Sequence, residues 1–136
     1  MRLQLAINVR DLEAAIDFYT RAFGVNLNKR MPGYANLVLE NPAVKLVLFE
    51  QPDAVNQLNH VGFEVFDDAD VAVAADRLAA AGLETELQEE KTCCFARQNK
   101  VVTYDPNGIM WEWYRVLEDS STFGGEPAAL EQTSCA

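Results

Sequence analysis

The sequence has few residues suited to covalent catalysis or cross-linking: one histidine, His60, and three cysteines, two of them adjacent. An odd number of cysteines with a neighbouring pair is a poor framework for disulfides. We therefore expect a reduced protein of the cytoplasm. Ser120 and Ser121 have no base nearby in the sequence, so nucleophilic serine catalysis is not expected.

Basic residues and long apolar runs are also scarce. The chain has 11 lysine and arginine residues against 21 aspartate and glutamate residues, a net charge of −10. Nucleic acids and anionic membrane surfaces bind clustered basic residues, so we expect neither as a partner. The apolar stretch from Leu3 to Val9 is interrupted by Gln4 and Asn8. No window approaches the roughly 20 apolar residues of a membrane span, and no targeting segment is expected.

The chain is long and apolar enough to form one domain with a core. It has 136 residues, of which 49% are hydrophobic, and a chain of this length buries roughly two-thirds of its unfolded surface. From Glu118 onward the composition turns to serine, glycine, glutamate and alanine. We predict a domain over residues 1–124 and a flexible tail over residues 125–136.

Strand and helix patterns occur twice in the same order. The first half predicts a strand over residues 3–9, a helix between Asp11 and Gly24, and strands over 25–30, 34–40 and 44–50. The second half predicts a strand over 60–65, a helix from Asp67 or Asp68 to Gly82, and strands over 84–88, 101–104 and 109–116. We therefore predict an α+β fold. Two paired βαβββ modules, about residues 1–52 and 57–117, form a cupped, open barrel-like sheet.

Alignment of the two halves makes a geometric prediction. Aligning the first strands by their alternation places Gln4 opposite His60, an offset of 56 (60 − 4). Aligning the last strands on their turn prolines, Pro42 and Pro106, gives an offset of 64 (106 − 42), which places Leu48 opposite Glu112. The aliphatic face of each first strand should pack on a helix. The other face, with Gln4 and His60, should face into the cup.

Gln4, His60 and Glu112 are candidate metal ligands. Glu112 interrupts the aromatic run Trp111–Tyr114, where a carboxylate is costly to bury unless it is paired or bound to a cation. The alternatives are a structural histidine, a solvated glutamine and an outward-facing glutamate. Together the three residues would leave coordination positions open. A set of two histidines and one carboxylate suits non-haem Fe(II), and here an amide would replace one imidazole. By ligand type Fe, Mn, Ni or Zn would fit, but structural zinc is disfavoured.

Cys93 and Cys94 form a second candidate site. Neighbouring thiolates suit a soft centre such as trivalent arsenic, Cd(II) or Cu(I). The alternative is two small apolar residues in a strand. Polar residues on both sides, over 89–91 and 97–98, favour an exposed loop that precedes a strand. Cys135 in the predicted tail is either a third thiolate or an unconstrained thiol.

Seven segments of the chain, between about Arg2 and Gly124, resemble the vicinal-oxygen-chelate superfamily of glyoxalases, bleomycin-resistance proteins and extradiol dioxygenases. Within it they resemble the organoarsenical carbon–arsenic lyases and the cadmium-induced proteins. The double cysteine combined with Asn59-His60-Val61-Gly62 is the most specific feature. The segments cover residues 3–6, 30–36, 45–50, 58–62, 91–96, 98–101 and 111–114.

The resemblance implies the paired-module fold and an iron-dependent reaction. Fe(II) would be held by Gln4, His60 and Glu112. Cys93 and Cys94 would bind a trivalent organoarsenical as the substrate-binding and catalytic thiols, on a mobile loop that closes over the cup. With O2 as co-substrate, methylarsenite or a reduced aromatic arsenical would lose its organic group and release arsenite. Paired modules of this superfamily often associate, so a homodimer is compatible with it.

Two other functions are open at this point. The protein could bind cadmium or arsenic through its thiols without turnover. It could also be another metal-dependent member of the superfamily, such as a glyoxalase-like isomerase or an extradiol dioxygenase, which would not need the thiols.

Overall fold

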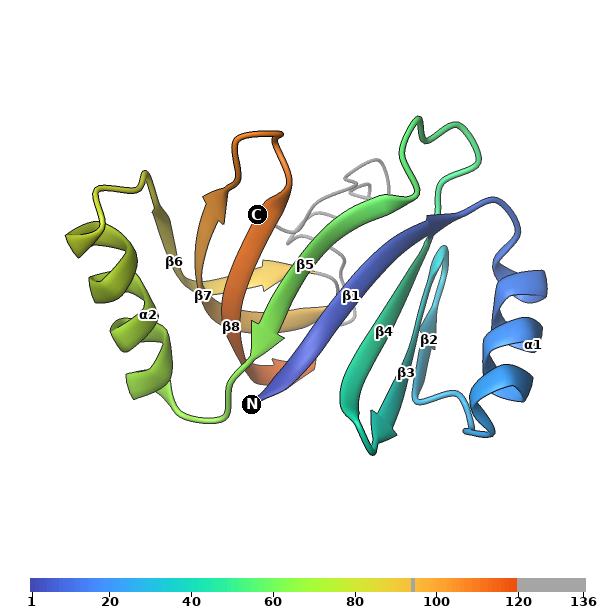
Figure 1. Ribbon diagram of the computed structural model, residues 1–136. Coiled ribbons are helices and arrows are strands. Elements are labelled where there is room, and N and C mark those ends of the chain that lie inside the picture. The colour runs from blue at the N-terminus through green and yellow to red at the C-terminus, as the bar shows by residue number, and fades with distance from the viewer. Residues whose placement is uncertain (94, 120–136) are drawn as a thin grey trace.

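The computed structural model describes residues 1–93 and 95–119 of the chain. They form one mixed sheet of eight strands in the order β2-β3-β4-β1-β5-β8-β7-β6, together with two helices (Figure 1). The elements in chain order are β1 Arg2–Val9, α1 Leu12–Phe23, β2 Lys29–Met31, β3 Tyr34–Glu40, β4 Ala43–Glu50, β5 Leu58–Glu64, α2 Asp68–Ala80, β6 Glu86–Cys93, β7 Ala96–Tyr104 and β8 Met110–Asp119. The predicted α+β class and the cupped, unclosed sheet are confirmed.

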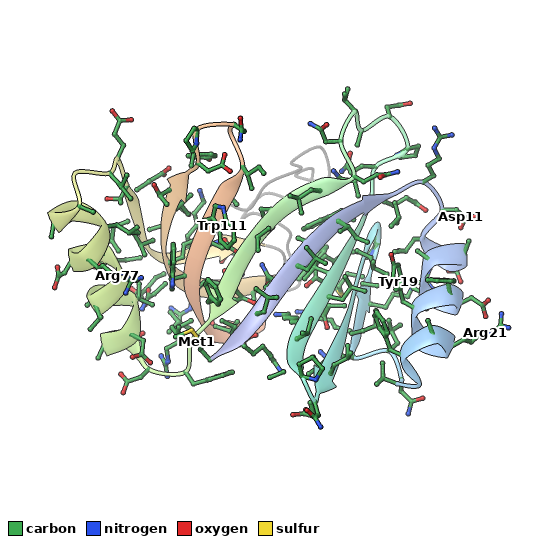
Figure 2. The ribbon with its side chains drawn as sticks, in the orientation of Figure 1. Met1, Asp11, Tyr19, Arg21, Arg77 and Trp111 are labelled. Atoms are coloured by element: carbon green, nitrogen blue, oxygen red, sulfur yellow. The ribbon has the colours of Figure 1, made fainter. Side chains whose placement is uncertain are left out.

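Each helix covers the outer face of its own half of the sheet (Figure 1). The α1 helix begins after Asp11, whose side chain accepts a hydrogen bond from the Ala14 amide, and ends at Gly24 with a φ of 66°, a left-handed conformation that glycine adopts without steric cost. Tyr19 lies between this helix and the sheet (Figure 2). The α2 helix begins after Asp67 and packs on a second apolar cluster. The inner face of the sheet is left to form the cup.

The antiparallel pairing of β1 with β5 joins the two halves. Leu5 pairs with Val61, and these residues are separated by the predicted offset (61 − 5 = 56). Gln4 and His60 therefore occupy equivalent places on either side of this pair. Both are on the inner face, as predicted from the alternation.

The offset predicted for the last strands is wrong by one residue. Ala6 pairs with Val47, and its equivalent Gly62 pairs with Glu112. Glu112 therefore corresponds to Val47, an offset of 65 (112 − 47), and not to Leu48, which packs on the outer face beneath α1. The reason is the turns. A two-residue turn joins β3 to β4, whereas five residues, 105–109, join β7 to β8, so the two prolines are not equivalent markers.

The bounds of several predicted strands differ from those observed: β7, predicted over 101–104, begins at Ala96, and two further differences have a clear physical cause. Val25 and Leu27, within the predicted strand 25–30, pack against the cluster beneath α1, and β2 is only Lys29–Met31. The alternation there reflects burial of one side of a connecting segment. The strand predicted over 84–88 extends to Cys93, so the prediction of a loop at Cys93 is wrong. β6 is an edge strand, and edge strands carry polar residues because one edge is unpaired.

The tip of the β6–β7 hairpin reaches the first half of the sheet. Phe95, only 4% exposed, joins the inner apolar cluster with Ala6, Val47 and Phe49. Its ring centroid lies 5.4 Å from that of Tyr34. Phe95 is thus the anchor that fixes the cysteine-bearing hairpin across the cup.

None of the helices in the described part of the chain has the length and apolar character that crossing a membrane requires.

Replacing Phe95 with alanine should lower the free energy of unfolding by about 3 kcal/mol, the typical cost of removing a buried phenyl ring. The variant keeps the Cβ atom, so the positive φ of 61° at this residue costs the same in both proteins. Urea denaturation measures the difference. The matched control is Phe18→Ala, because Phe18 is 59% exposed and its loss should cost under about 1 kcal/mol. Equal effects of the two substitutions would contradict the anchoring role.

Candidate metal centre and its cavity

Three buried polar side chains from three strands meet on the inner face of the sheet. Gln4 of β1, His60 of β5 and Glu112 of β8 are 5%, 1% and 2% exposed. Gln4 Nε2 lies 3.0 Å from His60 Nε2 and 2.9 Å from Glu112 Oε1. His60 Nε2 lies 3.2 Å from Glu112 Oε1. The structure thus brings together all three residues that the sequence singles out as candidate ligands.

The register of the central strands explains why these side chains meet. Gln4 pairs with Gly62, and Gly62 pairs with Glu112 on its other side, so the three residues lie in one row across the sheet. His60 is on the same face of β5 as Gly62, because alternate residues of a strand share a face. A Cβ atom on Gly62 would lie 2.6 Å from Glu112 Cγ and 2.5 Å from its carbonyl oxygen. Glycine is therefore required here for Glu112 to reach the cluster.

A relay of asparagines orients the His60 ring and selects its tautomer. The backbone carbonyl oxygen of Asn56 can only accept a hydrogen bond. It therefore orients the side-chain amide of Asn8, whose Nδ2 donates to it at 2.9 Å. Asn8 Oδ1 then accepts from Asn59 Nδ2 at 3.0 Å, which leaves Asn59 Oδ1 to accept from His60 Nδ1 at 2.7 Å. A neutral ring with its proton on Nδ1 has a free lone pair on Nε2. That lone pair faces Gln4 and Glu112.

Glu112 is held ionised by a buried lysine. Lys100 Nζ lies 2.9 Å from Glu112 Oε2, and the two side chains are 0% and 2% exposed. Burial alone would raise the pKa of the Glu112 carboxyl, but the charge of Lys100, followed by the interaction with the His60 ring, outweighs burial and holds that pKa well below its usual range. Because Oε2 is bound to Lys100, Oε1 is the oxygen that faces the other two residues.

Tyr114 orients the Gln4 amide through a hydrogen bond. Its hydroxyl donates to Gln4 Oε1 and lies 3.3 Å from Glu64 Oε1. Burial, followed by the charges of Glu64 and Glu112, raises the pKa of Tyr114 well above its usual value. The phenol therefore stays protonated and acts as a hydrogen-bond donor in this network.

The cluster fits a divalent metal ion. Ligand atoms about 2.1 Å from a metal and at right angles to one another lie about 3 Å apart, as these three do. The His60 Nε2 lone pair and Glu112 Oε1 are both acceptors, and the Gln4 amide nitrogen lies within hydrogen-bonding distance of both, where a bound cation would interact with the same two atoms. Rotating the Gln4 amide by 180° would present its oxygen to the metal and leave Tyr114 to donate to Glu64. In residues 1–93 and 95–119 no three His, Cys, Asp or Glu side chains could hold a metal, so the amide is needed.

The cluster lies in a cavity of about 300 Å³. Much of its wall is polar or charged, and three cations, Arg2, Lys29 and Lys45, line it with two carboxylates, Glu64 and Glu112. Burial lowers the pKa of the Lys45 ammonium, and the nearby carboxylate of Glu64 partly offsets this effect. A chain with a net charge of −10 therefore encloses a cavity with an excess of positive charge.

The hairpin that carries the cysteine pair forms part of the cavity wall. Ala96 and Gln98 of β7 line the cavity, and Cys93 at the end of β6 pairs with Ala96. Lys29 Nζ donates to the carbonyl oxygen of Phe95 at 2.6 Å. Only the backbone of Cys93 is described, and Cys94 and Cys135 lie outside the described residues.

Sequence reasoning missed Lys100 and Asn59. A lysine between Asn99 and Val101 in a strand gives no sign of burial, because lysine is almost never fully buried unless it is paired. The available signal was the alternation of β7: Lys100 shares a face with Gln98 and Val102. Asn59 could have been found as the neighbour of the only histidine, since ligating histidines usually bond through their second nitrogen to an oriented acceptor.

Comparisons with known proteins show the family to which the chain belongs. Residues 3–113 match the model of the Glyoxalase/Bleomycin resistance protein/Dioxygenase superfamily. The chain is 52% identical to the cadmium-induced protein CadI of Mycobacterium tuberculosis over 126 residues, 93% of this chain and 83% of that protein. It is 45% identical to a trivalent organoarsenical cleaving enzyme of Thermomonospora curvata over 135 residues, 98% of this chain and 87% of that protein. A solved superfamily member from Vibrio splendidus has the same fold, with a TM-score of 0.55, 18% identity, and coverage of 85% of this chain and 98% of that one.

Replacing Lys100 with methionine should lower the unfolding free energy of the metal-free protein at pH 7 by about 3–5 kcal/mol, because Glu112 would remain as a buried, uncompensated charge. In the wild type the pKa of Glu112 is lower in the folded protein than in the unfolded chain. The ionised carboxylate therefore stabilises the fold at pH values above its unfolded-state pKa, and this stabilisation is lost as the pH falls through its folded-state pKa. In the variant burial dominates and raises that pKa, so protonation stabilises the folded state. The difference between the two proteins should therefore shrink as pH falls from 7 to about 4.

Urea denaturation with a chelator, at pH 7, 5.5 and 4, measures this difference. Arg21→Met is the matched control, since it removes an exposed pair with Asp17 that is worth under about 1 kcal/mol. A loss for Lys100→Met no larger than the control, or one that does not change with pH, would show that the buried pair does not hold Glu112 ionised.

Proposed function

Because the chain belongs to the Glyoxalase/Bleomycin resistance protein/Dioxygenase superfamily, we propose that it is a metal-dependent enzyme that cleaves the carbon–arsenic bond of trivalent organoarsenicals. The metal is Fe(II), the co-substrate is O2, and arsenite is released. The substrates are methylarsenite and reduced aromatic arsenicals. The observation that carries the proposal is the cluster of Gln4, His60 and Glu112 inside a cavity that the cysteine-bearing hairpin helps to enclose.

Gln4, His60 and Glu112 would hold the metal, which when bound would supply the redox chemistry with oxygen. Three protein ligands leave further positions for small molecules. The chain's own contribution is to fix these ligands. Asn59 holds the His60 ring with its Nε2 lone pair facing the site, and Lys100 occupies one carboxylate oxygen of Glu112 so that the other is available.

Cys93 and Cys94 would bind the arsenic atom of the substrate, since trivalent arsenic prefers thiolate ligands. Support comes from the backbone around them. Cys93 pairs with Ala96, which lines the cavity, and the anchor at Phe95 keeps the hairpin tip beside the inner face of the sheet. Holding the two reactants in one cavity removes much of the entropic cost of their encounter.

The relatives support an arsenic-related function. The Thermomonospora curvata protein is described as a trivalent organoarsenical cleaving enzyme, and its match extends over 98% of this chain. A Bacillus protein with the same description is 34% identical. Location in the cytoplasm and association as a homodimer remain predictions from the sequence.

Binding of cadmium or arsenic without turnover is the second candidate function. It is favoured by the 52% identity to a protein described as cadmium-induced. Such a function would need the thiols and not the cluster around His60.

The proposed function predicts that protein loaded with Fe(II) releases arsenite from methylarsenite in air. His60→Ala should abolish the release and leave arsenical binding without oxygen unchanged, because the thiols are intact. Cys93→Ser combined with Cys94→Ser should weaken that binding strongly. Arsenite is measured by chromatography coupled to elemental mass spectrometry.

The outcomes separate the two functions. Arsenical binding without release, by folded protein that has bound iron, would reject the lyase and favour sequestration. Release that survives His60→Ala would reject the metal cluster as the reaction centre.

A further inference from the structure

The cavity holds more positive charge than the proposed metal ligands need. Arg2 and Lys45 line it on the side of Glu64. Arg2 donates to Glu64 Oε1 through Nε at 3.1 Å and Nη2 at 2.8 Å, so one carboxylate oxygen is already shared by an arginine and the Tyr114 hydroxyl. One formal positive charge remains in the group formed by Arg2, Lys45 and Glu64.

Lys45 carries that excess. Its Nζ lies 3.7 Å from Glu64 Oε1, beyond hydrogen-bonding distance, and 5.5 Å from the centroid of the Tyr114 ring. The side chain is 13% exposed, and the cavity is the space that it lines. The nearest carboxylate, Glu64, is already bonded to Arg2 and makes no hydrogen bond to Lys45. A cation that is largely removed from water in this way binds an anion strongly.

The position of Lys45 relates it to the proposed reaction centre. Lys45 pairs with Gln4 across β1 and β4, so both lie on the inner face, one strand apart, or about 5 Å between backbones. Val47, two residues on, lines the same cavity. A molecule at the cluster could thus extend an organic group over Val47 and present its far end to Lys45.

The cavity is also larger than the smallest substrate needs. Its volume is about 300 Å³, whereas a methyl group occupies only a small part of such a space. An arsenic-bound benzene ring would fill more of it. The net charge of the lining would then favour a ring substituent that is negatively charged.

We propose that Lys45, supported by Arg2, binds a carboxylate on the organic group of the substrate, so that the protein prefers aromatic arsenicals bearing a carboxylate. This inference rests on the proposed function for the place of the arsenic atom. It adds the chemical class of the organic group.

The experiment compares binding of phenylarsenite, 3-carboxyphenylarsenite and 4-carboxyphenylarsenite to the iron-loaded protein without oxygen, by isothermal titration calorimetry. At least one carboxylated isomer should bind about tenfold more tightly than phenylarsenite, which corresponds to 1.4 kcal/mol. Lys45→Met should remove this preference, measured within the variant as the ratio of its affinities for the carboxylated arsenical and for phenylarsenite.

Arg21→Met is the control for a general change in charge. Arg21 is exposed on α1 and points away from the sheet (Figure 2), so this variant should keep the wild-type preference. The inference is overturned if wild-type protein binds neither carboxylated isomer more tightly than phenylarsenite, or if Lys45→Met keeps the preference. If Lys45→Met fails to fold, the affinities of the wild-type protein for the carboxylated isomers and for phenylarsenite decide whether the inference holds.

The proposed function is read out separately by release of arsenite from phenylarsenite in air. Release with no preference for a carboxylate would reject the inference and leave the lyase in place. A Lys45-dependent preference without release would reject the lyase and keep the anion site.

Discussion

The pairing of β1 with β5 is the constraint on which the site depends. It places Gln4 beside Gly62, and the parallel pairing of β5 with β8 places Glu112 on the other side of the same glycine. A slip of one residue in either pairing would turn one of these side chains to the outer face, because alternate residues of a strand face opposite ways. The register is fixed by the aliphatic residues that each half buries beneath its helix. The same packing therefore determines both the fold and the position of the cluster.

Burial then decides the chemistry of the cluster. Lys100 and Glu112 are both fully enclosed, and each would be costly to bury alone. Paired, they present one carboxylate oxygen to a histidine whose tautomer is set by a chain of amides that ends on a backbone carbonyl. These two acceptors lie 3.2 Å apart, each about 3 Å from the Gln4 amide nitrogen, which is the spacing of ligand atoms around one metal ion. This is the physical reason for reading the cluster as a metal centre.

The sequence was sufficient for the repeat and for the inner faces of β1 and β5, because alternation and helix caps are local signals, and the place of Glu112 within an aromatic run was enough to mark it as unusual. It was insufficient for the offset of the last strands, since turn prolines do not report turn length, and for the second half of β6, since an edge strand with polar residues resembles a loop. Lys100 and the asparagine relay escaped because their significance depends on partners distant in the chain. The anchoring of the hairpin by Phe95 depends in the same way on Tyr34 of the other half.

The most direct test is X-ray absorption spectroscopy at the metal edge of protein loaded with one equivalent of Fe(II), compared with His60→Ala. If Gln4, His60 and Glu112 hold the iron, the spectrum will show only nitrogen and oxygen neighbours at about 2.1 Å. It will include the scattering pattern of one imidazole, which His60→Ala removes. A spectrum dominated by sulfur neighbours at about 2.3 Å, or one unchanged by His60→Ala, would show that the metal does not bind at Gln4, His60 and Glu112.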